Sequence, residues 1–267
     1  MTSSMTMPWP EPALADKRWH QVLRRRFDRA ADGYERLARA QKHSADDLLR
    51  SLEPQGLVLD VGCGSGYLAR QLAASSAVDE VLALDISEGM LRAPAWREPC
   101  PAGAPRRLCA DAARLPLADG CVDMLVSNFA LHWCPGPSDL MRELRRVMRL
   151  GGEAGLVIPV AGSLAGRGDA AARGASLRLA DDWRSAARAG GWAVATEGLV
   201  DYVEFHPDAD AWLQALRAMG VTARRGTGLG LSGRAALVAL RDRLEATREH
   251  AGIPLRYQTW RASLRAI

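Results

Sequence analysis

The feature that most constrains this chain is a short apolar run that leads through closely spaced glycines into a helical pattern. Residues 57–61 are apolar except for Asp60 and too few for a helix, which is typical of a buried strand in a parallel sheet. Gly62, Gly64 and Gly66 follow at alternate positions, where the missing Cβ allows a sharp turn and the close approach of a ligand. A helix predicted at about 67–74 would point its N-terminal N–H groups at the same space.

The spacing of these glycines argues against a dinucleotide-binding loop. That loop has the pattern Gly-x-Gly-x-x-Gly/Ala, and position 67, where its third small residue would stand, is tyrosine. Asp60 precedes the turn, where its carboxylate would repel a pyrophosphate but can face an ammonium group. The loop therefore favours a cationic, amino-acid-like ligand. In this respect the chain resembles the class I S-adenosylmethionine-dependent methyltransferases, whose first motif has this form.

Strand and helix patterns alternate along the rest of the chain. Further strands are predicted at about 80–84, 107–110, 122–127, 154–158, 193–205 and 253–263, and helices at about 139–148, 180–189, 208–219 and 234–250. This alternation predicts an α/β fold with a doubly wound, seven-stranded and mostly parallel sheet, the Rossmann-like methyltransferase fold. We expect Gly151 and Gly152 to end the helix before the fifth strand, and residues 159–175 and 224–230 to form loops.

The expected domain organisation is one methyltransferase domain over residues 53–267 with additions at its N-terminus and near its C-terminus. Residues 1–16 show no periodic pattern and are predicted to be disordered. Residues 17–52 are predicted to form a helical lid, and residues at about 207–252 a helical insertion.

The lid carries one stripe of residues at helical spacing. Phe27, Tyr34 and Gln41 recur every seven residues and therefore share one side of a helix. Gly33 interrupts this pattern and predicts a kink or a division into two helices. The stripe has two interpretations, an amphipathic helix that covers a sheet edge or a lid whose aromatic residue faces a methyl group.

Acidic and amide side chains follow the predicted strands, where open α/β sheets bind their ligands. Asp85 ends the second strand, and its carboxylate can accept both hydroxyl protons of a ribose; the alternative is a solvent-facing aspartate that caps the next helix. Asp111 and Ala112 end the third strand and are predicted to face the adenine edge. Asn128 follows the fourth strand.

Composition and charge exclude several classes of protein. No apolar run approaches the ~20 residues that a membrane span needs, and the N-terminus lacks an apolar signal core, so secretion is not expected. The five cysteines form no Cys-x-x-Cys pair, which fits reduced thiols in the cytoplasm and no metal site. From Trp212 onward ten arginines stand against three acidic residues. This basic segment suggests an acidic partner or substrate, such as a carrier protein, a phosphorylated small molecule or nucleic acid.

The flanks of the sheet carry a narrower resemblance, covering about residues 27–260. Four segments resemble motifs of the malonyl-acyl-carrier protein O-methyltransferases of biotin synthesis: 27–34 with Ala40-Gln41, 131–134, 216–220 and 253–257. The chain departs from that family on the acceptor side. His132 replaces a glutamine, Ile158-Pro159-Val160 replaces a Thr-Thr pair, and the segment between Gly162 and Leu179 is shorter.

This resemblance implies methyl transfer from S-adenosylmethionine to the free carboxylate of malonyl-acyl-carrier protein, which starts the pimeloyl chain of biotin. The acceptor carboxylate is ionised at neutral pH, so no general base is required and His132 is expected to be a neutral packing or hydrogen-bonding residue. The implied cofactor contacts are Tyr34, Gln41, Asp60, Gly62, Cys63, Gly64, Gly66, Asp85, Ile86, Met90, Asp111, Ala112 and Asn128. Tyr34 is expected to close the pocket over the methyl group, and Trp133 and Arg256 to bind the acceptor.

Three alternatives remain. The changed segment after the fifth strand allows another small-molecule acceptor, such as a quinone or polyketide intermediate. The basic C-terminal segment allows nucleic-acid methylation or binding, although Ser127-Asn128-Phe129-Ala130 stands where a base-flipping amino methyltransferase has Asn/Asp-Pro-Pro-aromatic. The third alternative is a cofactor-binding subunit that activates a partner without catalysis.

Overall fold

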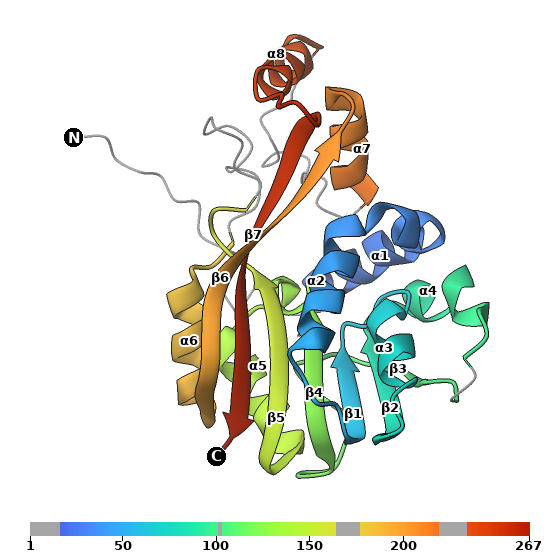
Figure 1. Cartoon of the computed structure of the whole chain (residues 1–267), viewed down its shortest axis with the longest axis vertical. Helices are drawn as coiled ribbons and strands as arrows, with labels where there is room; N and C mark the ends of the chain where they lie inside the picture. The colour runs from blue at the N-terminus through green and yellow to red at the C-terminus, as the bar shows by residue number, and fades with distance from the viewer. Residues whose placement is uncertain (1–16, 101–102, 164–176, 219–233) are drawn as a thin grey trace.

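The computed structural model describes residues 17–100, 103–163, 177–218 and 234–267 and shows one sheet with helices on both faces (Figure 1). The sheet is seven-stranded, in the order β3-β2-β1-β4-β5-β7-β6. Its strands are β1 (Gly56–Val61), β2 (Val78–Asp85), β3 (Arg106–Cys109), β4 (Val122–Asn128), β5 (Met148–Pro159), β6 (Trp192–His206) and β7 (Ile253–Ala266).

The strand pairing confirms the predicted doubly wound, mostly parallel sheet. β1 pairs in parallel with β2 and β4, and the parallel set continues through β3 and β5. β7 runs antiparallel to both of its neighbours, β5 and β6. The order changes direction at β1 and β4, so the carboxyl ends of β1, β2 and β4 meet at the crevice where such sheets bind ligands.

The alternation of side chains along β1 divides the core into two layers. Val58 packs in the cluster that contains helix α2 (Arg39–Arg50), whereas Leu59 and Val61 pack in the cluster that contains helix α5 (Pro137–Val147). Asp60 shares the face of Val58 and is 1% exposed.

The helices are α1 (Lys17–Leu37), α2 (Arg39–Arg50), α3 (Tyr67–Leu72), α4 (Glu88–Leu91), α5 (Pro137–Val147), α6 (Ala180–Ala189), α7 (Ala209–Ala218) and α8 (Arg234–Glu245), with short 3-10 turns η1 (Pro94–Arg97) and η2 (Leu131–Trp133).

The N-terminal helical region consists of two helices, one of the two arrangements predicted from Gly33, but the division does not fall at Gly33. Gly33 lies inside α1, and a Cβ added there would meet nothing within 4 Å. The break falls at Ala38, whose φ of −86° and ψ of 50° depart from helical geometry. Because Ala38 is 4% exposed, packing of the lid against the domain decides the position of the break rather than the low helix propensity of glycine.

The glycine pair 151–152 does not end a helix, contrary to expectation. α5 ends at Val147, and β5 begins at Met148, six residues before the predicted start. The register between β4 and β5 shifts between Val122 and Met124, and Gly151, with φ of +78°, lies in the irregular part of β5. Helices expected to reach 74 and 250 end earlier, at Leu72 and Glu245. Residues 1–16 and 224–230, for which disorder and a loop were expected, lie outside the described residues, as do residues 164–175 of the loop predicted at 159–175. Pro159, the first residue of that predicted loop, is the last residue of β5.

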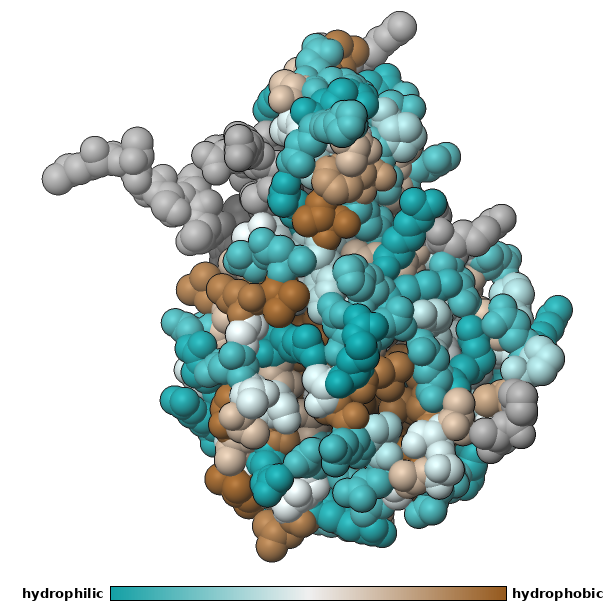
Figure 2. Space-filling model, viewed as in Figure 1, coloured by the Kyte–Doolittle hydropathy of each residue, from teal (hydrophilic) through white to brown (hydrophobic). Residues whose placement is uncertain are grey.

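β6 and β7 form a long antiparallel hairpin that extends past the other strands toward α7 and α8 (Figure 1). Trp212 of α7 donates its indole N–H to the carbonyl of Pro254 at 3.1 Å, which fixes α7 to the hairpin. Seen from the same side, most of the surface is hydrophilic, and apolar residues gather in separate small patches (Figure 2). The hairpin with α7 and α8 is called the C-terminal arm below.

Candidate functional site

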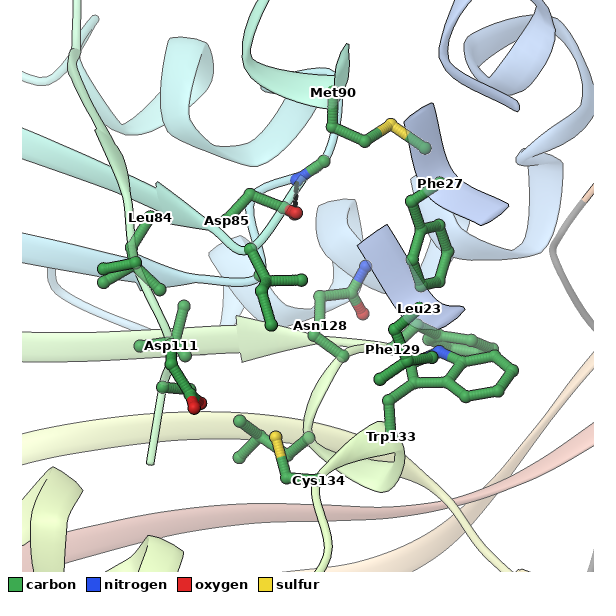
Figure 3. A pocket seen from close by; sticks show the side chains of 18 of the residues that line it. Leu23, Phe27, Leu84, Asp85, Met90, Asp111, Asn128, Phe129, Trp133 and Cys134 are labelled. Carbon is green, nitrogen blue, oxygen red and sulfur yellow. Dashed lines mark hydrogen bonds between the residues drawn. The ribbon is translucent and has the colours of Figure 1, made fainter. Parts of the chain in front are cut away.

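Two adjoining pockets lie at the carboxyl ends of β1, β2 and β4. The main pocket encloses about 730 Å³, including space open to solvent, and the side pocket about 460 Å³. Both are lined by Tyr34, Gly62, Gly64 and Asn128, so one elongated ligand can span them. In Figure 3 the lid residues Leu23 and Phe27 lie with Trp133 on one side of the main pocket, and Asp85 and Asp111 lie on the other.

The glycine turn after β1 forms the floor between the two pockets. Gly62 has φ of +77°, and a Cβ there would lie 2.1 Å from the Cβ of Ala130. Gly64, with φ of +54°, lies under the ring of Tyr34, whose Cε1 would be 3.7 Å from an added Cβ. Only glycine adopts these conformations without strain, so the turn leaves open the space that a ligand backbone needs.

Asp60 lines the side pocket as a buried carboxylate. Its Oδ2 has no hydrogen-bond partner among the described residues. Burial, and secondarily the charge of Asp85, raises the pKa of Asp60 to about 8. A buried carboxyl oxygen without a partner favours binding of a cation, because an ammonium group would supply both a charge and a hydrogen-bond donor to Oδ2.

Asp85 lines the main pocket and is oriented by backbone donors. Its Oδ2 accepts from the N–H of Gly64 at 3.0 Å and its Oδ1 from the N–H of Ser87 at 2.8 Å. Burial raises its pKa to about 6, against these two hydrogen bonds. The alternative role as a solvent-facing helix cap is wrong, because Asp85 is 8% exposed and Ser87 is the N-cap of α4.

The predicted adenine contacts come together in the main pocket. Ile86, Met90, Asp111 and Ala112 all line it. The carboxylate of Asp111 is also engaged inside the protein: it accepts from the N–H of Ala113 at 2.9 Å and lies 3.1 Å from His20 Nδ1. Asp111 therefore joins the sheet edge to the lid as well as lining the pocket.

Asn128 lies between the two pockets and holds α2. Its Nδ2 donates to the carbonyl of Gln41 at 2.8 Å, and its Oδ1 accepts from the hydroxyl of Ser44 at 2.6 Å. Gln41 and Cys63, two of the predicted cofactor contacts, line the side pocket. Burial raises the pKa of the Cys63 thiol, so it remains uncharged beside the two acids. Gly66 turns the chain into α3 with φ of +87° and lines neither pocket.

The lid closes the main pocket with aromatic side chains. Tyr34 lines both pockets, and burial together with the charges of Asp85 and Glu204 raises the pKa of its hydroxyl well above the usual range. Its hydroxyl is therefore a hydrogen-bond donor at neutral pH. Trp133 lines the pocket and meets the ring of Phe27 edge-on, with centroids 5.7 Å apart. The carbonyl of Trp133 accepts from the indole N–H of Trp19 at 3.1 Å, which ties this wall to the lid.

The sequence analysis missed His20, which lines the main pocket, and Asp28, which lines neither pocket but attaches the lid beside it. His20 lies seven residues before Phe27, so extending the Phe27-Tyr34-Gln41 stripe by one repeat would have found it. Asp28 has no such signal: its carboxylate accepts from the hydroxyl of Ser87 at 2.6 Å and the N–H of Gly89 at 2.9 Å. These bonds attach the lid to the loop that follows Asp85.

Arg256 and His132 do not line either pocket. The guanidinium of Arg256 is 2.6 Å from Glu249 on the C-terminal arm, so the structure does not bring this arginine to the other site residues. Among the described residues that line the main pocket there is no arginine or lysine. His132 packs beside the ring of Trp133, and burial lowers its pKa to about 3, so the imidazole is neutral.

The described ranges contain no group of three metal-ligating side chains and no helix long and apolar enough to cross a membrane. In the basic C-terminal segment, most arginines whose side chains the structure describes have acidic neighbours. Arg241, Arg248, Arg256 and Arg265 pair with Asp210, Glu245, Glu249 and Glu153. These four ion pairs compensate part of the positive charge of this segment within the described residues.

Comparison with known proteins gives matches over most of the chain. Residues 59–156 match the family described as methyltransferase domain. Malonyl-acyl-carrier protein O-methyltransferases are 34% identical (Alcanivorax borkumensis; 97% of this chain and 91% of the relative) and 31% identical (Laribacter hongkongensis; 91% and 90%). The fold resembles that of geranyl diphosphate C-methyltransferase from Streptomyces coelicolor, which was solved with Mg²⁺, geranyl diphosphate and S-adenosyl-L-homocysteine. The TM-score is 0.53 and the sequence identity 16%, and the match covers 84% of this chain and 79% of that one.

Proposed function

The chain belongs to the malonyl-acyl-carrier protein O-methyltransferase family, and from that premise we propose that it methylates the free carboxylate of a malonyl group on acyl-carrier protein. The methyl donor is S-adenosylmethionine, and the product begins the pimeloyl chain of biotin. The observation that carries this proposal is the buried carboxylate of Asp60 beside the glycine turn, because it fits the charged amino-acid part of that donor.

The donor site extends across both pockets. Asp60 and the turn at Gly62 and Gly64, with Gln41 and Cys63, hold the methionyl part in the side pocket. Gly66 acts from outside the pocket by turning the chain into α3. Asp85 binds the ribose with the lone pairs that Gly64 and Ser87 leave free. Ile86, Met90, Asp111 and Ala112 surround the adenine in the main pocket. Asn128 lies at the junction, where its backbone carbonyl can accept from the amino group.

Bound S-adenosylmethionine supplies a methyl group already activated by its sulfonium. The acceptor carboxylate is ionised at neutral pH, so this chain has no proton to remove. Its residues act by positioning, an effect that reaches about 7–11 kcal/mol in well-oriented reactions. Tyr34 covers the junction of the two pockets, and Phe27 and Trp133 exclude water from the acceptor side.

The acceptor enters through the main pocket, where Trp133 is the proposed contact. Arg256 remains a proposed acceptor contact that would require the C-terminal arm to approach the pocket, because its guanidinium pairs with Glu249. The five free cysteines and a carrier-bound acceptor favour action in the cytoplasm.

Mass spectrometry of the carrier protein tests this proposal. Malonyl-acyl-carrier protein incubated with the enzyme and S-adenosylmethionine should gain the mass of one methylene unit, and esterase treatment should remove it. Acetyl-acyl-carrier protein, which lacks the free carboxylate, is the matched control and should not change. A protein that binds S-adenosylhomocysteine but leaves malonyl-carrier protein unmodified would have another acceptor, such as a quinone or polyketide intermediate.

A further inference from the structure

The first turn of α2 lacks a cap from its own sequence. Ala38 precedes the helix and makes no side-chain hydrogen bond to it, and the first turn contains no acidic residue. The N–H groups at a helix start have no acceptor within the helix. The N–H of Ala40 is one of them, and because Ala40 is 3% exposed, water cannot easily take the place of a protein acceptor.

A residue from the C-terminal arm supplies the missing acceptor. Oε1 of Glu204, on β6, accepts a hydrogen bond from the N–H of Ala40 across 164 residues of sequence. Glu204 is 6% exposed, and its Oε2 lies 3.6 Å from His206 Nε2. A carboxylate at a helix N-terminus also interacts favourably with the helix dipole. A buried acid on β6 thus binds the first turn of α2, although the two segments lie far apart in the sequence.

The residues on either side of this bond belong to the cofactor pocket. The N–H of Ala38 donates to the carbonyl of Tyr34 at 3.0 Å, so the last turn of α1 is bonded to the break that precedes Ala40. Gln41 follows Ala40, and its carbonyl accepts from Asn128. Tyr34 and Gln41 therefore depend on the conformation of a short segment, 38–40, that Glu204 holds in place.

We propose that Glu204 is a positioning residue of the cofactor pocket, which fixes the break between α1 and α2 and thereby sets Tyr34 and Gln41 against the glycine turn. It connects the C-terminal arm to the lid. The identity of the bound cofactor rests on the function proposed above, whereas the effect of Glu204 on α2 does not. The two parts can therefore be tested separately.

Trypsin tests the effect on α2, because the peptide bond between Arg39 and Ala40 contains the N–H that Glu204 binds. Arg39 is exposed, so the folded helix turn is what protects this bond. Glu204→Ala should increase cleavage after Arg39 about tenfold, consistent with the loss of an N-terminal cap. Glu204→Gln keeps an acceptor oxygen and should stay close to the wild type. The 39–40 cut is identified by fragment mass.

Glu197→Ala is the matched control. Glu197 lies on the same strand and binds Arg184 and the indole N–H of Trp260, so its loss weakens the fold without touching α2. This variant should not accelerate the 39–40 cut beyond the change in global unfolding, measured by thermal denaturation. Equal acceleration in the Glu204→Ala and Glu197→Ala variants, or none in Glu204→Ala, would overturn the proposed role.

Calorimetry with S-adenosylhomocysteine tests the effect on the pocket. Glu204→Ala should weaken binding about tenfold, Glu204→Gln less than threefold and Glu197→Ala not at all, where a tenfold change equals about 1.4 kcal/mol. Unchanged affinity in Glu204→Ala with an accelerated 39–40 cut would overturn the positioning role. A wild-type protein that does not bind S-adenosylhomocysteine would instead contradict the proposed function, and the trypsin result would still decide whether Glu204 orders α2.

Discussion

The backbone N–H of Gly64 donates to a carboxylate oxygen of Asp85 at 3.0 Å, which joins the turn after β1 to the end of β2. The other oxygen of Asp85 accepts from Ser87, so the carboxylate is held at both oxygens while part of it still faces the main pocket. The hydroxyl of Ser87 donates in turn to Asp28 of the lid. Turn, strand end and lid are thus one hydrogen-bonded unit around the pocket.

Gly62→Ala should destabilise the protein and abolish binding of S-adenosylhomocysteine. A Cβ at this position would lie 2.1 Å from Ala130 Cβ, and a left-handed conformation at a non-glycine residue itself costs about 1–3 kcal/mol. Gly33→Ala is the control: it lies in α1 with open space around its Cα and should stabilise the helix by up to about 1 kcal/mol. Urea unfolding and calorimetry measure the two effects, and equal behaviour of the two variants would contradict the role of the turn.

The stability of the ligand-free protein should fall as the pH rises from 6 to 8. The pKa of Asp60 is raised to about 8 in the fold, above about 4 in the unfolded chain. Its stabilising contribution is therefore complete below pH 4 and is lost as the pH rises through 8. Asp85, whose pKa is about 6 in the fold, has already lost most of its own contribution to the free energy of unfolding by pH 6.

Asp60→Asn should remove this decline in the free energy of unfolding between pH 6 and pH 8. His132, whose lowered pKa acts in the opposite direction, is present in both proteins and cancels in the comparison. Urea unfolding of the wild type and the variant across this range provides the measurement. Parallel curves for the two proteins would show that Asp60 does not titrate in the window.

Binding of S-adenosylhomocysteine at pH 7 should release on the order of one proton. Asp60 is protonated in the ligand-free protein at this pH, because its pKa is about 8, and the ammonium group of the ligand favours the ionised form. Calorimetry in two buffers of different ionisation enthalpy measures the release. The Asp60→Asn variant should show none, and a wild type without proton release would contradict the proposed ammonium site.

Tyr34→Phe should retain most of the turnover, whereas Tyr34→Ala should lose roughly 100-fold, as misplacement of reacting groups does. The raised pKa of the Tyr34 hydroxyl keeps it protonated, so it cannot serve as a base at neutral pH. The ring, which lies over Gly64, provides the closure. Steady-state kinetics with malonyl-carrier protein distinguish these roles: an inactive phenylalanine variant would give the hydroxyl a direct part in the reaction.

His132→Gln should change turnover far less than the roughly 100-fold or more that removal of a general base costs. The imidazole is neutral, with its pKa lowered to about 3, and it lines neither pocket. Between pH 6 and pH 7 the turnover rate should also depend on pH in the same way in the wild type and in the variant. An ionisation in this range that is lost in the variant would identify His132 as a base after all.

The sheet and much of the site could be predicted because they depend on local periodicity. Alternation along β1 places Asp60 and Val58 on one face, and parallel strands bring Asp85 and Asn128 to the same edge. The break at Ala38 and the early start of β5 could not be predicted from Gly33 or from Gly151. In both regions packing and strand pairing outweigh the conformational preference of a single glycine.

By itself, the sequence determined that this chain forms strand–turn–helix units around a glycine turn preceded by an acid, because side-chain periodicity and missing Cβ atoms act over a few residues. Only the tertiary structure decided which distant side chains meet. His20 reaches Asp111, Glu204 reaches the N–H of Ala40, and Arg256 turns to Glu249 instead of the pocket. These pairings depend on how the lid and the C-terminal arm pack on the sheet, a three-dimensional relation that no local pattern encodes.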